Sequence, residues 1–218
     1  MLLEEVFTYI ILFIMVKTCM FLIRKIRGNL LFDVLRNLLF FVPFILPSLY
    51  LGLPNLNFQG SIDYYLLAIF SSFLALSTKY KEFKPYFNKN FYHILPKISF
   101  KDFLIMEISL IGSAVFEEFF YRTYAPASSF IVGMVLSGIL FSIAHYIQNY
   151  TRSFFDLKTY ILLFLLGIIW YWSYKNTGTL VPAILGHLVY NLPSMIFTYF
   201  HYKSSKIWVK KKGDYSIE

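Results

Sequence analysis

The stretch Ser113–Arg122 reads SAVFEEFFYR and sets two adjacent glutamates and an arginine inside an apolar, aromatic run. Ionisable side chains near the centre of a membrane helix cost about 2.5 to 3.5 kcal/mol each on insertion scales, so they mark an internal ion pair or a functional site. Glu118 and Arg122 are four residues apart and can pair on one helical face. This pairing leaves Glu117 without an assigned partner, which favours a functional site.

The composition is that of an integral membrane protein. Of 218 residues, 58% are hydrophobic, 21% aromatic and only 15% charged, whereas soluble domains have roughly 45 to 50% apolar and about 25% charged residues. The single cysteine, Cys19, excludes an intrachain disulfide. The start, MLLEEVF, lacks the basic region and cleavage site of a secretory signal, so the first apolar run is expected to remain as an anchor.

Hydrophobic runs predict an all-α, polytopic membrane fold with about seven transmembrane helices, six or eight being the alternatives. The runs cover residues 6–23, 38–53, 64–78, 103–120, 128–147, 160–174 and 180–200. Pro43 and Pro47 are expected to kink the second helix. The chain divides into N-terminal membrane helices with a basic loop (1–102), a catalytic membrane core (103–200) and a basic cytoplasmic tail (201–218).

The basic residues lie in clusters between or after the apolar runs, the pattern of cytoplasmic loops under the positive-inside rule. The clusters are Arg24, Lys25, Arg27 and Arg36; Lys79, Lys81, Lys84, Lys89, Lys97 and Lys101; Arg152 and Lys158; and Lys203, Lys206, Lys210, Lys211 and Lys212. The net charge of +8 therefore orients the protein in a membrane and does not indicate nucleic acid as a partner. We expect a protein of the bacterial plasma membrane, in contact with lipid, whose C-terminus is cytoplasmic; its oligomeric state is left open.

Polar side chains within the apolar runs recur at helical spacing. Three pairs, each four residues apart, share a helix face: Glu118 with Arg122, Phe141 with His145, and His187 with Asn191. Glu117 and Glu118 point about 100° apart, so the economical assignment makes Glu118 and Arg122 an orienting ion pair and leaves Glu117 to face the histidines. Lys17 is near enough to a helix end to snorkel.

Two features bear on how the histidines are used. Small residues on the helix that carries His145 include Gly133 and Ser137, and they are expected to let it approach the glutamate helix at its small patch, residues 112–114. His93 and His201 lie in or next to polar, basic segments and are expected to be exposed.

Two carboxylates, two imidazoles and an amide supply what a water-splitting peptidase needs. A carboxylate and a histidine can activate water, while the second histidine and Asn191 can donate hydrogen bonds to the developing oxyanion. Glu117, His145 and His187 are also a zinc ligand set, and the residues do not decide between a metal and a metal-free site. Neither HExxH nor GxSxG occurs.

The three ordered motifs EEFFYR, FSIAH and HLVYN resemble EExxxR, FxxxH and HxxxN of the CAAX-protease and bacteriocin-processing family, also called Abi or type II CAAX prenyl endopeptidase-like proteins. The resemblance covers roughly residues 103–193. It implies cleavage of a peptide bond inside the membrane. By motif position, the implied roles are water activation by Glu117 and His145, oxyanion stabilisation by His187 and Asn191, and support by Glu118, Arg122 and Phe141.

The resemblance also implies a substrate peptide that is prenylated, leader-bearing or of a bacteriocin or signal type. Members of the family have been classed both as metalloproteases and as metal-independent glutamate proteases. The predicted function is an intramembrane endopeptidase. The alternative is a non-catalytic immunity or sensor-partner protein on the same fold; a proton-coupled transporter is disfavoured because internal repeats and paired broken helices are missing from the sequence.

Overall fold

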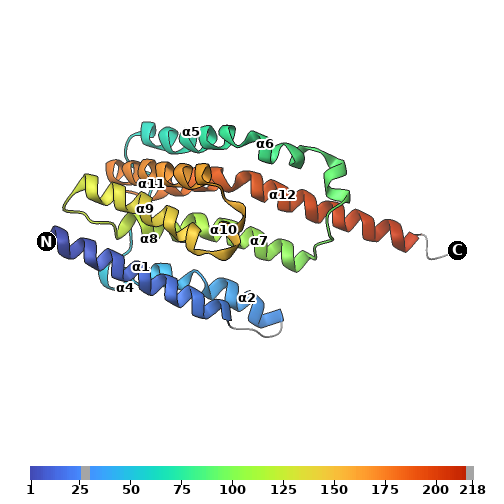
Figure 1. The fold of residues 1–218 in the computed structure, drawn as a ribbon, viewed down its shortest axis with the longest axis horizontal. Helices are drawn as coiled ribbons and strands as arrows, with labels where there is room; N and C mark the ends of the chain where they lie inside the picture. Colours follow the sequence, from blue (N-terminus) through green and yellow to red (C-terminus); the bar gives the residue numbers. More distant parts are fainter. Residues whose placement is uncertain (26–29, 215–218) are drawn as a thin grey trace.

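The computed structural model describes residues 1–25 and 30–214 and shows an elongated bundle of helices (Figure 1). No strand occurs in these two ranges, so the predicted all-α class is confirmed. Two basic features of the sequence fall outside this description. Arg27 lies in the gap, and the side chains of the tail beyond Lys206 are not described.

Short helices and turns connect the long helices of the bundle. In chain order the elements are α1 (Leu2–Lys25), α2 (Leu30–Leu39), α3 (Val42–Ile45), α4 (Ser48–Leu51), α5 (Ile62–Thr78), α6 (Tyr80–Phe83), η1 (Lys84–Phe87), η2 (Lys89–His93), α7 (Phe100–Gly112), η3 (Ser113–Glu117), α8 (Glu118–Thr123), α9 (Phe130–Ile147), α10 (Asn149–Phe154), α11 (Leu157–Thr177) and α12 (Val181–Asp214). Element η3 is a π-helical turn.

Within the described residues, four helices are long and apolar enough to cross a membrane. They are α1, α9, α11 and the part of α12 from Val181 to Lys206. The ranges Leu35–Ile45 and Ile62–Thr78 are apolar but shorter. The predicted count of seven spans is therefore not confirmed.

The predicted second span, residues 38–53, is not one kinked helix but the end of α2 followed by the short helices α3 and α4. Pro43 and Pro47 explain the difference, because each proline lacks a backbone N–H and its ring clashes with the preceding helical turn. Pro43 stands in the first turn of α3, and Pro47 immediately precedes α4. Both positions suit the start of a helix, so a new short helix begins at each proline.

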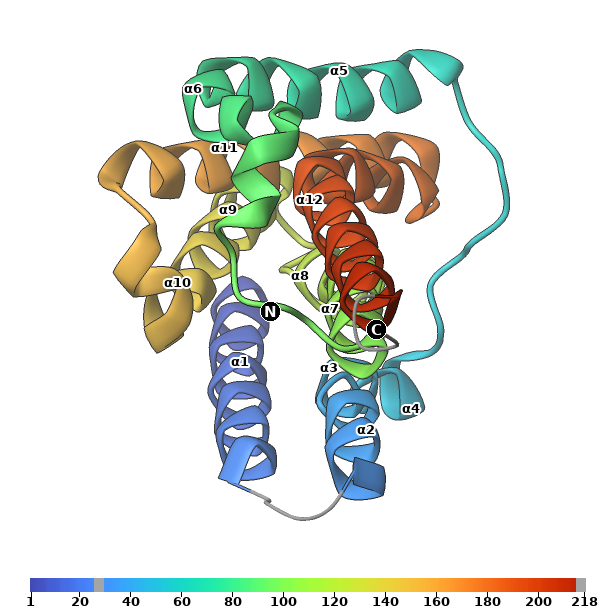
Figure 2. The ribbon, with the colours of Figure 1, turned by 90° about the vertical axis from the view of Figure 1, so that its right-hand side faces the viewer.

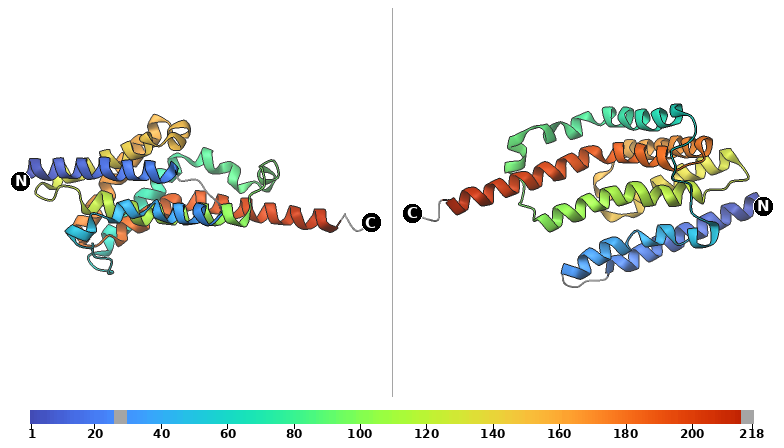
Figure 3. Two further views of the ribbon diagram at one scale, coloured as in Figure 1. Left: turned by 90° about the horizontal axis from the view of Figure 1, so that it is seen from below. Right: turned by 180° about the vertical axis from the view of Figure 1, so that it is seen from behind.

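The helices form layers along the long axis of the molecule. Helix α12 packs against α5 and α7, and α11 packs against α9 and α5. Figure 2 shows α1 and α2 on the side of the molecule opposite α5. Helix α12 extends past its neighbours at its C-terminal end (Figure 3). This arrangement surrounds the segment α7–η3–α8, which carries the glutamate pair, with α12, α9 and α1.

The segment α7–η3–α8 begins at a capping box formed by Ser99 and Asp102. The Asp102 amide donates to Ser99 Oγ at 3.1 Å, and the Ser99 hydroxyl donates to Asp102 Oδ2 at 2.7 Å. This hydroxyl bond, with the backbone N–H of Ser99, holds the pKa of the Asp102 carboxyl below its usual value. The capping box fixes where the helix begins, and the π-helical turn changes its rotation. Together they set the directions in which the side chains of Glu117 and Glu118 point.

Small residues bring α9 very close to α11. A Cβ atom added to Gly138 would lie 2.8 Å from the carbonyl oxygen of Phe164, and one added to Gly167 would lie 2.7 Å from the Cα of Gly138. The patch at residues 112–114 was expected to face α9. Gly112 of this patch lies instead against the Phe41 ring, 2.5 Å from an added Cβ, and Ser113 contacts Asn191 of α12. Helix α9 instead meets α8 through hydrogen bonds.

The basic loops gather at one end of the bundle. Arg24 Nη2 donates to Gln148 Oε1 at 3.2 Å, which joins the ends of α1 and α9, and Lys101 Nζ pairs with Asp33 Oδ2 at 2.8 Å, which joins α7 and α2. The lysine-free loop of residues 54–63 packs on the α11–α12 turn at the other end. The gathering agrees with the predicted clusters, while the cytoplasmic side itself stays a prediction.

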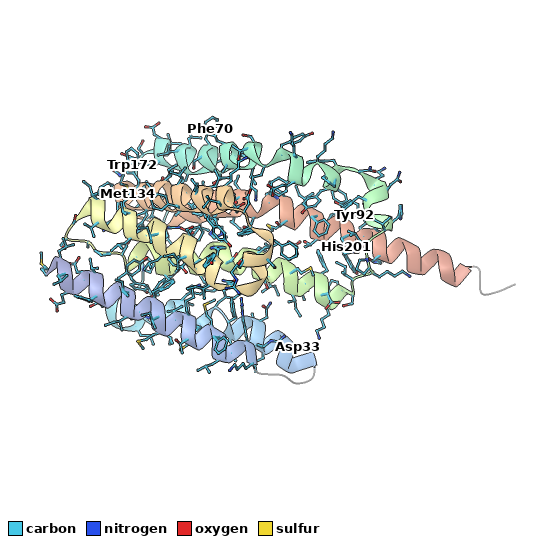
Figure 4. The ribbon with its side chains drawn as sticks, viewed as in Figure 1. Asp33, Phe70, Tyr92, Met134, Trp172 and His201 are labelled. Carbon is cyan, nitrogen blue, oxygen red and sulfur yellow. The ribbon has the colours of Figure 1, made fainter. Side chains whose placement is uncertain are left out.

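Of the two histidines expected to be exposed, His93 is exposed and His201 is not. His201 is buried, and its Nε2 lies 2.6 Å from the carbonyl oxygen of Pro96. Figure 4 places it beside Tyr92, toward the C-terminal part of α12. The segment after η2 folds back over α12 and covers it, which the local sequence does not indicate. His201 is thus a packed structural histidine.

Candidate active site

Glu118 is the hub of a fully buried polar cluster. Arg122 donates to its carboxylate from Nε at 2.6 Å and from Nη2 at 3.3 Å, so the pair predicted from the four-residue spacing is present. His187 approaches from α12, with its Nδ1 2.8 Å from Glu118 Oε1. One carboxylate therefore binds both an arginine of its own helix and a histidine of α12.

Arg122 is held in place by α9 and by aromatic rings. Its Nη1 donates to the Ser137 hydroxyl, which itself donates to the carbonyl oxygen of Tyr121 at 2.8 Å. The guanidinium carbon lies 5.0 Å from the centre of the Phe141 ring and 5.7 Å from that of Trp170. A planar, permanently charged guanidinium suits this combination of forked hydrogen bonds and ring stacking.

His187 is fixed in one orientation. Its ring stacks on Trp170 with centroids 4.9 Å apart and meets the Phe141 ring edge-on at 5.5 Å. Because a carboxylate only accepts hydrogen bonds, Nδ1 must carry the proton in the contact with Glu118. In the neutral ring, Nε2 is then left with a free lone pair.

His145 is oriented in the same manner by its own helix. Its Nδ1 lies 2.9 Å from the carbonyl oxygen of Phe141, an acceptor only, so the proton again sits on Nδ1 and Nε2 is basic in the neutral ring. The ring contacts Phe141 at 4.9 Å and Phe155 at 6.2 Å. Since the Phe141 ring touches both this histidine and His187, it sets the spacing between them. These ring contacts are the ones made by Phe141, the residue that the sequence predicts to support the site.

Glu117, the last residue of the π-helical turn, has different surroundings from its neighbour. It is 5% exposed, and its Oε2 has no hydrogen-bond partner in the described residues. Its carboxylate acts electrostatically on His145 and on Lys17 of α1. The sequence expected Glu117 to face both histidines, but the hydrogen bond to His187 comes from Glu118.

Asn191 joins α12 to the π-helical turn. Its Nδ2 donates to the carbonyl oxygen of Leu110 at 2.9 Å and to the Ser113 hydroxyl oxygen at 3.2 Å. An amide nitrogen has two hydrogens, so both are used. The Leu110 carbonyl also accepts from the backbone N–H and the hydroxyl of Ser113, at the junction between α7 and the π-helical turn. In this arrangement Asn191 holds α12 against the segment that carries the glutamates.

Lys17 was expected to snorkel to the membrane surface, and this expectation is wrong. Its ammonium group is buried and has no hydrogen-bond partner in the described residues. The reason is tertiary, because α1 presents the stripe Glu5, Tyr9, Phe13 and Lys17, four residues apart in each step, to α8 and its flanking chain. Sequence reasoning missed this residue, although the stripe itself was a visible signal.

The residues do not fit the zinc site that the sequence left as an alternative. In the described part of the chain, no three His, Cys, Asp or Glu side chains come together so that they could hold a metal ion. We therefore derive no chemical step through a metal.

Comparison with known proteins gives this part of the chain a family. Residues 99–193 match the model of a family described as Type II CAAX prenyl endopeptidase Rce1-like. The matched segment starts at the capping residue of α7 and includes Glu117, His145, His187 and Asn191. Neither the curated proteins nor the solved structures gave a match.

Proposed function

Because residues 99–193 match the family described as Type II CAAX prenyl endopeptidase Rce1-like, we propose that the chain is an intramembrane endopeptidase. It hydrolyses a peptide bond in a membrane-associated peptide that carries a prenyl group or a leader, or that is of a bacteriocin or signal type. Its partners are the surrounding lipid and this peptide. The reaction is carried by water that Glu117 and His145 activate.

The observation that carries the proposal is the unequal use of two adjacent buried carboxylates. Glu118 is bonded to Arg122 and His187, whereas one oxygen of Glu117 in the same interior has no hydrogen-bond partner among the residues that the structure describes. Burying a carboxylate without a hydrogen-bond partner is costly. A fold that keeps such a group within electrostatic reach of the oriented His145 has a base ready for a small polar reactant, and water is the smallest.

In the proposed reaction, a water oxygen attacks the carbonyl carbon of the scissile bond while its proton passes to the Glu117 carboxylate. His145 accepts a second hydrogen bond from the water through Nε2, which fixes the direction of attack. The carbon–nitrogen bond of the tetrahedral intermediate then breaks, and the proton held by Glu117 passes to the leaving amine. The products are a new carboxyl terminus and a new amino terminus.

The negative charge that develops on the carbonyl oxygen needs a donor. We assign this role to Nε2 of His187 when the ring is protonated on both nitrogens, with Glu118 as the counter-charge at Nδ1. Asn191 supports the site by holding α12 against the π-helical turn, and it donates to the oxyanion only if it releases Leu110 or Ser113. Its expected oxyanion role is therefore proposed here as secondary.

A cellular comparison tests the proposed function. Membrane-associated peptides are measured by mass spectrometry from cells that produce the wild type, Glu117→Gln or Glu4→Gln at equal levels. Glu4 is an exposed glutamate of α1 and serves as the matched control. We expect at least one peptide pair, substrate and cleaved product, to change with Glu117→Gln only. An identical peptide set in all three strains would contradict proteolysis.

A further inference from the structure

Lys17 is a buried cation that the proposed reaction does not use. Helix α1 lies outside the matched segment 99–193, yet it places a buried ammonium group 5.9 Å from the ring centre of Tyr121, four residues after Glu117. Removing an ammonium from water costs several kcal/mol even after relaxation of the protein. A lysine kept at such a cost in the middle of α1 needs a compensating partner.

The register of α1 against the glutamate helix is fixed at the N-terminal end of the stripe. Glu5 Oε2 accepts from the backbone amides of Ala127 and Ser128 at 2.8 and 2.9 Å. One turn further on, the Tyr9 hydroxyl donates to the carbonyl oxygen of Tyr121 at 3.0 Å. Because these contacts hold α1 both along its axis and in rotation, Lys17 is presented to the interior and cannot turn toward lipid.

Aromatic rings surround the ammonium group. Lys17 Nζ lies 5.8 Å from the ring centre of Phe13, 5.6 Å from that of Phe44 and 5.9 Å from that of Tyr121. All three distances lie near the upper limit of about 6 Å for a cation–π contact, so the rings offset only part of the desolvation cost. The remaining compensation must come from an anion, and Glu117 is the carboxylate that acts on Lys17.

Three polar atoms in this region are buried and lack a hydrogen-bond partner among the described residues: Lys17 Nζ, Glu117 Oε2 and the Tyr121 hydroxyl. Glu117 acts electrostatically on both other groups. Buried polar groups in native proteins are nearly always paired, often through an ordered water. Lys17 Nζ lies 5.9 Å from the centre of the Tyr121 ring, and Glu117 precedes Tyr121 by four residues, about one helical turn. We infer that one ordered water serves all three groups.

The charges of the interior support the same pairing. Glu118 and Arg122 cancel each other in a direct ion pair. With both histidines in the neutral form, before His187 takes up the proton that its oxyanion role requires, Glu117 has no cation in direct contact among the described residues. Lys17 is a buried cation that can offset this carboxylate.

We propose that Lys17 is a positioning residue of the active site, which holds the Glu117 carboxylate in place beside His145 through a water shared with the Tyr121 hydroxyl. The catalytic part of this inference rests on the proposed function, whereas the charge pairing does not. Helix α1 is then a working part of the site and not only a membrane anchor.

A double-mutant cycle tests the pairing without any assay of activity. The apparent melting temperatures of Lys17→Met, Glu117→Gln and the double variant are measured in the same lipid or detergent. Each single change leaves one buried charge unpaired and is expected to lower the melting temperature, while the double change removes both charges and should melt closer to the wild type than the sum of the two losses predicts. Additive losses would overturn the pairing.

The positioning role is tested by kinetics on a peptide that the wild type cleaves. Lys17→Met is expected to lower kcat about tenfold or more with KM within about twofold, and Lys17→Arg should recover most of kcat because it keeps the charge. Lys25→Met, an exposed lysine of the same helix, is the control and should match the wild type. Full activity of Lys17→Met, or a Lys17→Arg variant as slow as Lys17→Met, would overturn the role. If the wild type cleaves nothing, the proposed function fails while the melting cycle still decides the pairing.

Discussion

Glu117→Gln is expected to abolish peptide cleavage by the purified protein while the helical bundle stays folded. The amide has nearly the shape of the carboxylate but cannot take a proton from water, and loss of a positioned general base lowers rates by about 10² to 10⁴-fold. The measurement is the initial rate of cleavage of a defined peptide by wild type and variant at equal concentrations of folded protein.

Two comparisons make the expected loss specific to chemistry. Glu4→Gln changes an exposed carboxylate of α1 in the same way and should retain the wild-type rate. Helix content and monodispersity of Glu117→Gln should match those of the wild type, which separates a lost base from a lost fold. A Glu117→Gln variant that keeps more than about a tenth of the rate would remove Glu117 from the role of base.

Arg122→Ala is expected to lower the free energy of unfolding by about 3 to 5 kcal/mol, the typical cost of breaking a buried pair from one side. Both Arg122 and Glu118 are 0% exposed, and the arginine also donates to Ser137. Its removal leaves the Glu118 carboxylate with His187 as its remaining partner in the described residues. Unfolding by denaturant in a fixed detergent measures the change.

Three further variants separate the geometry of Arg122 from its charge and provide a control. Arg122→Lys keeps the charge but loses the forked geometry, so its stability should lie between those of the wild type and Arg122→Ala. The double change Glu118→Leu with Arg122→Met removes both charges and should regain much of the loss. Arg36→Ala, which breaks a partly exposed pair with Asp33, should cost no more than about 1 kcal/mol. Equal stability of Arg122→Ala and the wild type would show that the pair does not hold the fold.

Most helices were predictable because long apolar runs and local caps decide them. The expected run 128–147 corresponds to α9, which starts where the Ser129 side chain accepts from the Val132 amide. The run 160–174 extends at both ends to α11, from the cap Asp156 to Gly178 with its positive φ of 69°. The prediction of the second span was wrong, because hydrophobicity alone cannot show that a new short helix begins at each of the two prolines.

The pairing of side chains within one helix was also predictable, because a four-residue spacing fixes a common face. The four-residue spacing predicted the contact of Glu118 with Arg122 and that of Phe141 with His145, which follows it by one helical turn. It could not tell which glutamate meets His187, since that depends on the rotation of one helix against another. The π-helical turn decides this rotation, and no pattern in SAVFE predicts it.

The burial of Lys17 could not be predicted from the residues around it in the sequence, for a similar reason. A lysine eight residues from the end of an apolar helix can snorkel or be buried, and only the tertiary packing of α1 on α8 decides between them. The stripe from Glu5 to Lys17 would have indicated a packed face, because its polar members recur at the helical period. Its partners lie more than a hundred residues away in the chain.

The central claim is that water, activated at Glu117, cleaves a peptide bond directly. The most direct measurement is the mass of the product that the purified wild type forms in water labelled with a heavy oxygen isotope and containing hydroxylamine. We predict a labelled carboxyl terminus, no hydroxamate, and no labelled product with Glu117→Gln. A hydroxamate would reveal a covalent acyl intermediate, and labelled product formed equally by Glu117→Gln would show that Glu117 does not activate the water; either result contradicts the account.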